Sequence, residues 1–346
     1  MRESAKVETG LWETLEARLP PRASLVPGDG CTESVAAVPD RIWARAVVGP
    51  LREFLRRPGK GFRGAIVRGA WRSTRPGTEP PPALPAIVEL IHAGSLVVDD
   101  IQDDSSHRRG RPSLHRLIGA PLAMNCGSSL FFWPFELVGE LDLPPERELA
   151  LVRRLTRAML RCHHGQALDL EARIDELSAE ETPAVVAAAA ELKTGALLEL
   201  AAALGAFAAG ADEALVGAWE RFGCRLGVGL QMLNDLANLH GCSEPAKRHE
   251  DLRCGRPTWP WAWLAEIATP SDFAVMQTWQ RDALVGSRSP SALAERLRRK
   301  VESHGRIVAR AYLATAVADL ADEFGDSPAL AEIGAEISRL EAAYAG

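Results

Sequence analysis

The sequence predicts an all-α protein. Its 346 residues include only 2 tyrosines and 9 phenylalanines, whereas alanine, leucine, arginine and glutamate are abundant, a composition that favours helices. Apolar residues recur at helical spacing, and neither strand-like alternation nor an internal repeat is evident. We therefore expect one domain of about ten or more helices at residues 40–346. An arm with a short helix is expected at residues 1–39.

The helical patterns follow one another along the chain. Asp40 is expected to cap the first, and the periodicity places helices at residues 41–57, 62–75, 84–104, 120–141, 145–174, 182–209, 211–239 and from 258 onward. The proline-rich stretch at residues 76–82 is interpreted as a connector within the domain. Three charged residues interrupt the longest apolar stretch, at residues 184–210, so the sequence does not predict a transmembrane protein.

Charge and cysteine usage exclude further classes. A net charge of −6 leaves no basic footprint for nucleic acid. The 6 cysteines form neither a C-x-x-C pair nor a zinc-ligand spacing, which is typical of thiols in a reducing compartment. The N-terminus has no apolar signal core. A cytoplasmic protein is expected.

Four aspartates follow an apolar helical run at residues 87–98. Asp99 and Asp103 are spaced i, i+4 and share a helix face, with Asp100 and Asp104 beside them. Such a cluster alone is more often a solvated helix end, but the preceding run is too apolar for an exposed face. Carboxylates this close repel one another unless cations neutralise them, and Mg²⁺ takes one or two carboxylates together with water and phosphate oxygens. The pattern therefore predicts a magnesium–diphosphate site.

Basic residues suited to phosphate accompany this cluster. Arg108 and Arg109 carry planar, permanently charged guanidinium groups that match phosphate oxygens. His92 lies two helical turns before the first aspartate and is a candidate hydrogen-bond donor to diphosphate. Lys60 and Arg63 stand where a glycine-rich loop enters a helix, whose N-terminus favours an anion. Alone, such a loop is more often solvated surface.

A second polar stripe lies much further along the chain. Gln231, Asn234, Asp235 and Asn238 fall at i, i+3, i+4 and i+7 on an otherwise apolar helix. A buried structural network is the alternative interpretation. Together with the first acidic cluster, the stripe is better interpreted as the second wall of one metal–diphosphate site.

Lys193 and Thr194 stand inside an alanine-rich helix. A cation in apolar surroundings needs a counter-charge, although a lysine that extends to solvent is an equally good interpretation. Gln166 and Asp169 form another i, i+3 polar pair, which we interpret as an interhelical hydrogen bond.

In their order, these motifs resemble the trans-isoprenyl diphosphate synthases, and among them the geranylgeranyl diphosphate synthases of eukaryotic type. The likeness covers residues 40–265 and includes Gly59-Lys60-x-x-Arg63, His92, Asp99-Asp100-x-x-Asp103, Arg108-Arg109-Gly110-x-Pro112, Gly165-Gln166-x-x-Asp169, Lys193-Thr194-Gly195, Gln231 with its stripe, and Glu250-Asp251-Leu252 with Gly255. The resemblance implies an isoprenoid synthase fold, a single bundle of helices around a deep central cavity, and a homodimer.

The resemblance also implies the residues' roles. Up to three Mg²⁺ ions would bind with diphosphate at Asp99, Asp103 and the supporting Asp100, and at Asn234 and Asp235. The allylic diphosphate would be bound by Arg108, Lys193, Thr194 and Gln231, and isopentenyl diphosphate by Lys60, Arg63, His92 and Arg109. Catalysis would rest on Asp99, Asp103, Lys193 and Gln231. The diphosphate leaves, the alkene attacks the allylic cation, and a proton is lost.

Three departures from the family fall on the second wall. The family commonly has Asp where Asn234 stands, Lys near Ala246, and Lys where Arg256 stands. An asparagine can coordinate a metal through its oxygen but adds no charge, so this wall is expected to offer only Asp235. Lys247 is expected to replace the missing lysine by a shift of one residue.

Chain length is predicted from one helical turn. Gly94 and Ser95 stand just before the first acidic motif, and small residues there would leave room for a growing tail. Bulky aromatics at these positions stop growth at fifteen carbons in the family, so the resemblance implies geranylgeranyl diphosphate. Phe131, Phe132 and Trp133 are candidates for the cavity floor.

Two alternative functions stay open. A terpene cyclase on the same fold would ionise a preformed prenyl diphosphate, and Trp259, Trp261 and Trp263 suit cation–π stabilisation, although alternate spacing cannot place all three on one helix face. A non-catalytic partner subunit of a synthase would explain the departures in the second motif, although the first acidic motif is intact.

Overall fold

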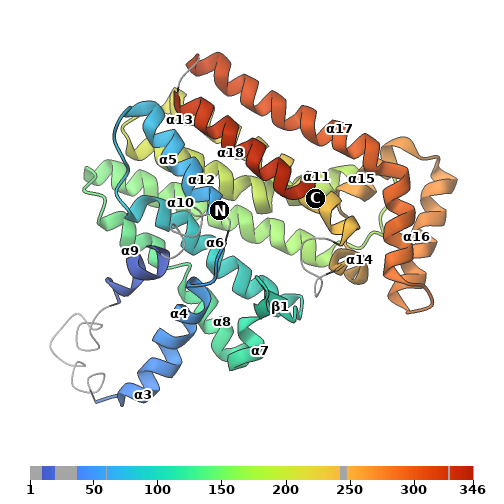
Figure 1. Cartoon of the computed structure of the whole chain (residues 1–346), viewed down its shortest axis with the longest axis horizontal. Coiled ribbons are helices and arrows are strands. Elements are labelled where there is room, and N and C mark those ends of the chain that lie inside the picture. The colour runs from blue at the N-terminus through green and yellow to red at the C-terminus, as the bar shows by residue number, and fades with distance from the viewer. Residues whose placement is uncertain (1–9, 20–36, 60, 242–247, 326–327, 346) are drawn as a thin grey trace. The chain divides into compact units, whose positions relative to one another are not determined.

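The computed structural model describes residues 10–19, 37–59, 61–241, 248–325 and 328–345, and most of them are helical (Figure 1). The all-α prediction is confirmed. Within these ranges the strands are β1 (His107–Arg108) and β2 (Arg111–Pro112), which pair antiparallel. No helix in the described part of the chain combines the length and apolar content needed to cross a membrane.

The chain divides into two compact units. The first unit comprises Met1–Gly64 and Pro80–Pro144, and the second comprises Ala65–Glu79 and Pro145–Gly346. The predicted single domain at residues 40–346 stays a prediction.

Helix α6 (Ala83–Gln102) is the centre of the first unit. Most of its residues are buried, and it packs against α7 (Leu114–Ile118), α8 (Ala120–Ser129) and α9 (Trp133–Gly139). The chain enters through α3 (Asp40–Trp43), the π-helical turn η2 (Ala44–Val48) and α4 (Gly49–Leu55), and then begins α5 (Phe62–Thr74). The carboxylate of Glu89 on α6 accepts a hydrogen bond of 2.9 Å from the backbone N–H of Gly64, which ties the start of α5 to α6.

One predicted helix is interrupted, and a proline explains the interruption. The helix predicted at residues 120–141 is two helices, α8 and α9, with Pro134 in the first turn of α9. A proline ring collides with the carbonyl group four residues earlier, so a helix cannot continue through that point. The helix predicted at residues 41–57 is not divided, because α3, η2 and α4 follow one another without a gap from Asp40 to Leu55, and the π-turn η2 lies directly before Pro50. The predicted cap residue Asp40 lies inside α3, and Pro39 is the N-cap.

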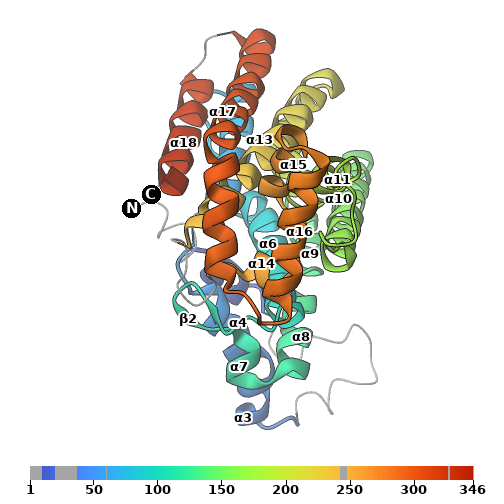
Figure 2. The same cartoon turned by 90° about the vertical axis from the view of Figure 1, so that its right-hand side faces the viewer.

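Helix α13 (Glu213–His240) is the centre of the second unit. It packs against α12 (Ala196–Ala208) and α17 (Pro290–Phe324), and α18 (Pro328–Ala345) also contacts it (Figures 1 and 2). The remaining elements are α10 (Pro145–Glu171), α11 (Thr182–Ala190), the π-helical turn η3 (Glu191–Gly195), α14 (Glu250–Cys254), α15 (Trp259–Ile267) and α16 (Pro270–Leu284). The helix predicted at residues 182–209 thus contains a π-turn.

Candidate functional site

The first acidic cluster stands at the C-terminal end of α6. Asp99 and Asp100 lie in its last turn, and Asp103 is its C-cap, with its backbone N–H 2.9 Å from the carbonyl oxygen of Asp99. The helix ends two residues earlier than predicted because Asp104 adopts a left-handed conformation with φ of 50°. The carboxylate of Asp100 is buried, whereas Asp99 and Asp103 are partly exposed.

Arg108 of the neighbouring hairpin pairs with two carboxylates of this cluster. Its Nε donates to both carboxylate oxygens of Asp100 at 2.9 and 3.0 Å, and its Nη2 donates to Asp100 Oδ1 at 2.6 Å. The same Nη2 donates to Asp99 Oδ2 at 3.2 Å. Such bidentate pairs are strong and fix orientation. Asp100 therefore holds Arg108 in place, and Asp99 and Asp103 are the more accessible carboxylates for a cation.

Sequence reasoning missed the β1–β2 hairpin that carries the two arginines. Arg109 and Gly110, with φ of 56° and 72°, form its two-residue turn. Positive φ at both central positions is the type I′ geometry that matches the twist of paired strands. Such turns usually read Asn-Gly or Asp-Gly, and here the positive φ of Arg109 is unusual. In the sequence, only Gly110 and the short distance between the two strands could have indicated this hairpin.

His92 lies among three of the predicted phosphate-binding arginines. Burial lowers the pKa of His92 well below its usual range, and the charges of Arg63, Arg109 and Arg108 lower it further. The first unit thus brings together Arg63, His92 and Arg109 of the predicted isopentenyl diphosphate set, with Arg108 of the predicted allylic set beside them. The neutral imidazole can still donate one N–H. Lys60, the remaining member of the four-residue isopentenyl diphosphate set, lies outside the described residues, as does Lys247.

The second polar stripe forms a buried network on α13. The hydroxyl of Thr194 donates to Gln231 Oε1 at 2.9 Å, and Gln231 Nε2 donates to Asp235 Oδ1 at 2.7 Å. The backbone N–H of Trp259 donates to Asp235 Oδ2 at 3.0 Å. Burial raises the pKa of Asp235 to about 8, and the charge of Asp251 adds to the shift. Asn234, one residue earlier, is exposed.

The second unit offers more carboxylates than the predicted single Asp235. Burial and the charge of Asp169 raise the pKa of Asp251 to about 6, and Asn238 donates a hydrogen bond to its carboxylate. Asp169 also contributes to the raised pKa of Asp235. Asp251 and Asp169 thus act electrostatically on Asp235, and the expectation that this wall offers only Asp235 to a metal stays a prediction. Asp251 belonged to a recognised motif, but its sequence gave no sign that it approaches Asp235.

Cations are present in the same network. Lys193 Nζ contacts Asp169 Oδ2 at 2.8 Å, which supplies the counter-charge expected for a lysine in an apolar helix. Arg256 is buried, and its Nη1 lies 3.6 Å from the same oxygen. The interhelical contact predicted for Asp169 is thus an ion pair with Lys193.

Lys193 and Thr194 stand on the π-turn η3, and a glycine makes room for it. A Cβ atom on Gly165 of α10 would lie 2.4 Å from the backbone nitrogen of Lys193. No side chain fits there, so the glycine allows the two backbones to approach. π-turns inside helices are frequent at functional sites.

The donor chemistry fits Mg²⁺. Within the described ranges, no three His, Cys, Asp or Glu side chains converge as a self-contained metal site. Magnesium, however, needs only one or two carboxylates and completes its shell with water and phosphate oxygens. Asp99 and Asp103 provide such oxygens in the first unit, and they would hold the ion together with a bound diphosphate.

The structure gives Gly94 a packing role. A Cβ atom at this position would lie 2.8 Å from the carbonyl oxygen of Gly127 on α8 and 3.2 Å from the ring of Phe131. The glycine therefore allows α6 and α8 to approach closely. Ser95 is partly exposed, and its hydroxyl donates to the carbonyl oxygen of His92 at 2.9 Å. A larger side chain has more room at Ser95. Phe132, another candidate for the cavity floor, is 69% exposed.

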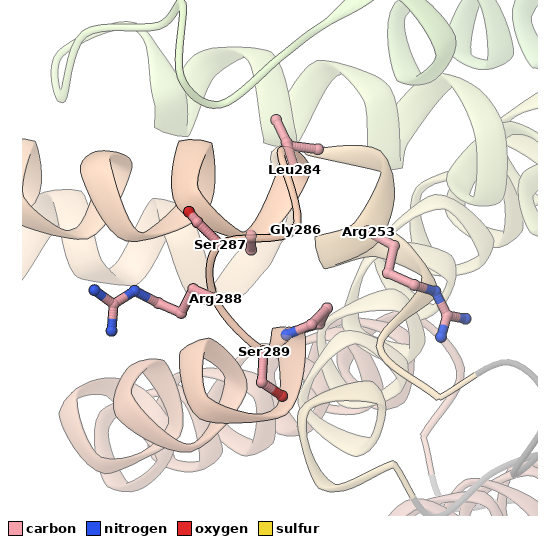
Figure 3. A pocket seen from close by; sticks show the side chains of 8 residues that line it. Arg253, Leu284, Gly286, Ser287, Arg288 and Ser289 are labelled. Atoms are coloured by element: carbon pink, nitrogen blue, oxygen red, sulfur yellow. The ribbon is translucent and has the colours of Figure 1, made fainter.

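A surface hollow on the second unit contains none of the predicted site residues. It is lined by Arg253, Ala283, Leu284, Gly286, Ser287, Arg288, Ser289 and Pro290, which include no carboxylate. Figure 3 shows the guanidinium groups of Arg253 and Arg288 pointing away from each other. They do not form an anion clamp.

Comparisons with known proteins give concordant results. A family model described as polyprenyl synthetase matches residues 45–288. Geranylgeranyl pyrophosphate synthase of Geoglobus acetivorans is 33% identical over 156 residues, which cover 44% of this chain and 47% of that protein. (2E,6E)-Farnesyl diphosphate synthase of Mycobacterium tuberculosis is 33% identical over 212 residues, 59% of this chain and 56% of that protein. The chain thus spans about half the length of these relatives.

A solved structure extends the likeness to the whole chain. Geranylgeranyl pyrophosphate synthetase from Pyrococcus horikoshii superposes with a TM-score of 0.73 and 22% identity, covering 97% of this chain and 98% of that one. The predicted isoprenoid synthase fold is confirmed.

Proposed function

We propose that this chain, which belongs to the polyprenyl synthetase family, is a prenyltransferase that condenses isopentenyl diphosphate with an allylic diphosphate. The observation that carries the proposal is the arrangement in the first unit. Acidic residues suited to magnesium stand beside a separate set of diphosphate-binding groups, and Arg108 contacts the acids while its charge acts on His92. A reaction between two diphosphates needs both kinds of group.

Each residue set has its own task in this reaction. Magnesium, when bound, would neutralise the allylic diphosphate and make it a better leaving group. Asp99 and Asp103 would hold the ion, and Arg108 would stabilise the charge that develops on the departing oxygens. Arg63, His92 and Arg109 would orient isopentenyl diphosphate so that its double bond reaches the cation. Lys60 belongs to the same set by resemblance.

The second unit would contribute its own diphosphate-binding groups. By resemblance these are Lys193, Thr194, Gln231 and Arg256, with Lys247, and Asn234 and Asp235 would be magnesium ligands. The acid-rich network supports this assignment, because burial and mutual repulsion raise the pKa values of Asp235 and Asp251, and a cation would relieve the repulsion. The prediction that the two acidic clusters face one another stays a prediction.

The proposed product is geranylgeranyl diphosphate. Ser95 leaves room on α6 near the first acidic cluster, which would admit a tail longer than fifteen carbons. We expect Ser95→Phe to shift the product towards farnesyl diphosphate while condensation with dimethylallyl diphosphate continues. Gly94→Ala serves as the contrast, because its Cβ would press on α8 and lower stability without a specific change in chain length. If Ser95→Phe makes the same product as wild type, Ser95 does not determine the chain length.

We also propose a homodimer in the cytoplasm. Helix α10 exposes Leu149, Leu160 and Leu168, with Leu160 55% exposed, and large apolar side chains on one helix favour burial against a partner. The free thiols of Cys126 and Cys224 fit a reducing compartment. Analytical ultracentrifugation of the wild type and of Leu160→Glu tests the dimer, which should dissociate in the variant.

The cyclase alternative loses its aromatic argument. Trp261 and Trp263 are fully buried, and Trp259 is 9% exposed. The ring of Trp261 packs edge-on against Phe273 with centroids 6.2 Å apart, and Trp259 packs against Trp263 at 6.0 Å. These rings serve the packing of α15.

One assay separates the candidate functions. Purified protein is incubated with Mg²⁺ and farnesyl or geranylgeranyl diphosphate, with and without isopentenyl diphosphate, and the products are identified before and after phosphatase. A longer linear diphosphate that requires isopentenyl diphosphate supports the proposal. A hydrocarbon formed without isopentenyl diphosphate would show a cyclase, and no product at all would favour the partner-subunit alternative.

A further inference from the structure

Arg57, just after α4, is a fully buried arginine that belongs to none of the recognised motifs. Its side chain is 0% exposed. Nη2 lies 3.4 Å from Glu53 Oε1, and the guanidinium carbon stands 5.4 Å from the centre of the Phe54 ring. Its Nε has no hydrogen-bond partner among the described residues. Burying a charge with one donor unsatisfied costs stability, so stability alone does not explain this arginine.

Its remaining contacts lead to the β1–β2 hairpin. Arg57 Nη1 donates to the backbone carbonyl of Arg108 at 3.3 Å. In the other direction, Arg109 Nη1 donates to the backbone carbonyl of Arg57 at 3.0 Å. Glu53, the acidic partner of Arg57, also accepts a hydrogen bond of 3.0 Å from Arg111 Nη1. Three of the hairpin's arginines are thus tied to the end of α4.

The hairpin needs such support. It is only two residues long on each side, and its turn places Arg109 at a φ of 56°, which L-residues other than asparagine and aspartate seldom adopt. An isolated hairpin of this size is not stable in water. On one side Asp100 fixes the side chain of Arg108, and on the other Arg57 fixes its backbone.

We infer that Arg57 is a positioning residue, which holds the hairpin so that Arg108 and Arg109 are preorganised to bind diphosphate. The inference rests on the proposed function, because that function gives the two arginines their ligand. Arg57 itself does not touch the substrate. Preorganised donors bind a diphosphate without first paying the entropy of ordering a loop.

The experiment compares two neighbouring arginines. Arg57→Met removes the buried charge and keeps a similar volume, and it leaves no buried carboxylate unpaired, because Glu53 is 39% exposed and keeps its contact with Arg111. Arg56→Met is the matched control, since Arg56 is the adjacent residue, its side chain is 53% exposed, and its acidic partner Glu13 is 3.8 Å away. Melting temperatures verify folding, and calorimetry measures the binding of pyrophosphate with Mg²⁺.

Arg57→Met should bind magnesium pyrophosphate about tenfold more weakly than wild type, and Arg56→Met should stay within about twofold. In a background of Arg108→Met with Arg109→Met, Arg57→Met should have no further effect, because its action passes through those residues. Unchanged pyrophosphate binding by folded Arg57→Met would overturn the inference. So would an equal loss of pyrophosphate affinity when Arg57→Met is added to the Arg108→Met, Arg109→Met variant.

Arg57→Lys keeps the test decisive if Arg57→Met does not fold. A lysine retains the charge, but its single ammonium group cannot span Glu53 and the Arg108 carbonyl as a planar guanidinium does. It should therefore fold and still bind pyrophosphate several-fold more weakly, whereas wild-type affinity would contradict the inference. Pyrophosphate binding needs no turnover. If the wild type had no condensation activity, the proposed function would be wrong, but the effect of Arg57→Met on pyrophosphate binding could still be measured.

Discussion

The two acidic clusters use the same residue type in opposite electrostatic settings. In the first unit, Asp100 is paired with Arg108 through a bidentate contact, and Asp99 and Asp103 are partly exposed. In the second unit, Asp235 is buried and receives its hydrogen bonds from neutral groups, the side chain of Gln231 and the backbone of Trp259.

The difference shows how surroundings decide what a carboxylate can do. The first cluster has a permanent cation in its own hairpin, which offsets part of its negative charge without a metal. Asp235 has no cation in direct contact among the interactions described, and burial with the charge of Asp251 raises its pKa to about 8. Near neutral pH it therefore holds a proton, which any metal ion that bound there would have to displace.

The largest expected effect belongs to the first cluster. Asp99→Ala should lower kcat/KM by about a thousandfold or more, because metal stabilisation of a leaving group supplies several kcal/mol. The control is Asp104→Ala, whose exposed carboxylate pairs with Arg116 at 2.6 Å, and it should stay within a few-fold of wild type. Steady-state kinetics with saturating Mg²⁺ measure both. Near-normal activity in Asp99→Ala would mean that the first cluster contributes less to catalysis than the second.

The next effect tests the internal cation. Arg108→Met should destabilise the protein by about 3 kcal/mol, because it leaves the buried carboxylate of Asp100 without its partner. Adding Asp100→Leu should restore most of that loss, since both charges are then absent. Chemical denaturation of the two variants measures the difference. If Arg108→Met has the same free energy of unfolding as wild type, the ion pair between Arg108 and Asp100 does not stabilise the first unit.

Local spacing predicted one cluster better than the other. Asp99, Asp103 and His92 share one helix, so their relation could be read from the sequence. The approach of Asp251 and Asp169 to Asp235 could not, because three separate helices bring them together. The break between α8 and α9 was readable in principle from Pro134.

Buried arginines and unusual turns are harder to predict from sequence. Arg56 and Arg57 are identical neighbours in the sequence, yet one is exposed and the other has no exposed side-chain surface. Tertiary packing alone distinguishes them. The π-turn at Glu191–Gly195 likewise depends on Gly165 of another helix, so nothing within the segment announces it.

A smaller effect concerns pH and the buried acid. Burial raises the pKa of Asp235 to about 8 in the folded protein, against an ordinary value of 3.8. The folded state therefore holds a proton that the unfolded state releases between these values, and Asp235 lowers stability progressively as pH rises through this window. Asp235→Asn removes the titration, and Gln231 can turn its amide to suit the new side chain.

Asp235→Asn should therefore melt about 3 °C or more above wild type at pH 8 without Mg²⁺, and the difference should vanish near pH 4. Scanning calorimetry at both pH values measures it. Asp104→Asn, at an exposed carboxylate, is the control and should show no such trend. A gain that is equal at both pH values would mean that Asp235 is not titrating in this window.

The smallest expected effect comes from Asn234, the exposed neighbour of the buried acid. Asn234→Asp adds a carboxylate that solvent reaches, so it carries its charge without the desolvation that affects Asp235. If the second cluster binds magnesium, this ligand should lower the Mg²⁺ concentration for half-maximal activity a few-fold, with little change in melting temperature. Magnesium titrations of the rate measure it, and Asn238→Asp offers a contrast, because Asn238 donates to Asp251 and a second acid there would repel it. An unchanged or higher magnesium requirement in Asn234→Asp would mean that the exposed position does not reach the ion, and that the buried carboxylates alone define the cluster.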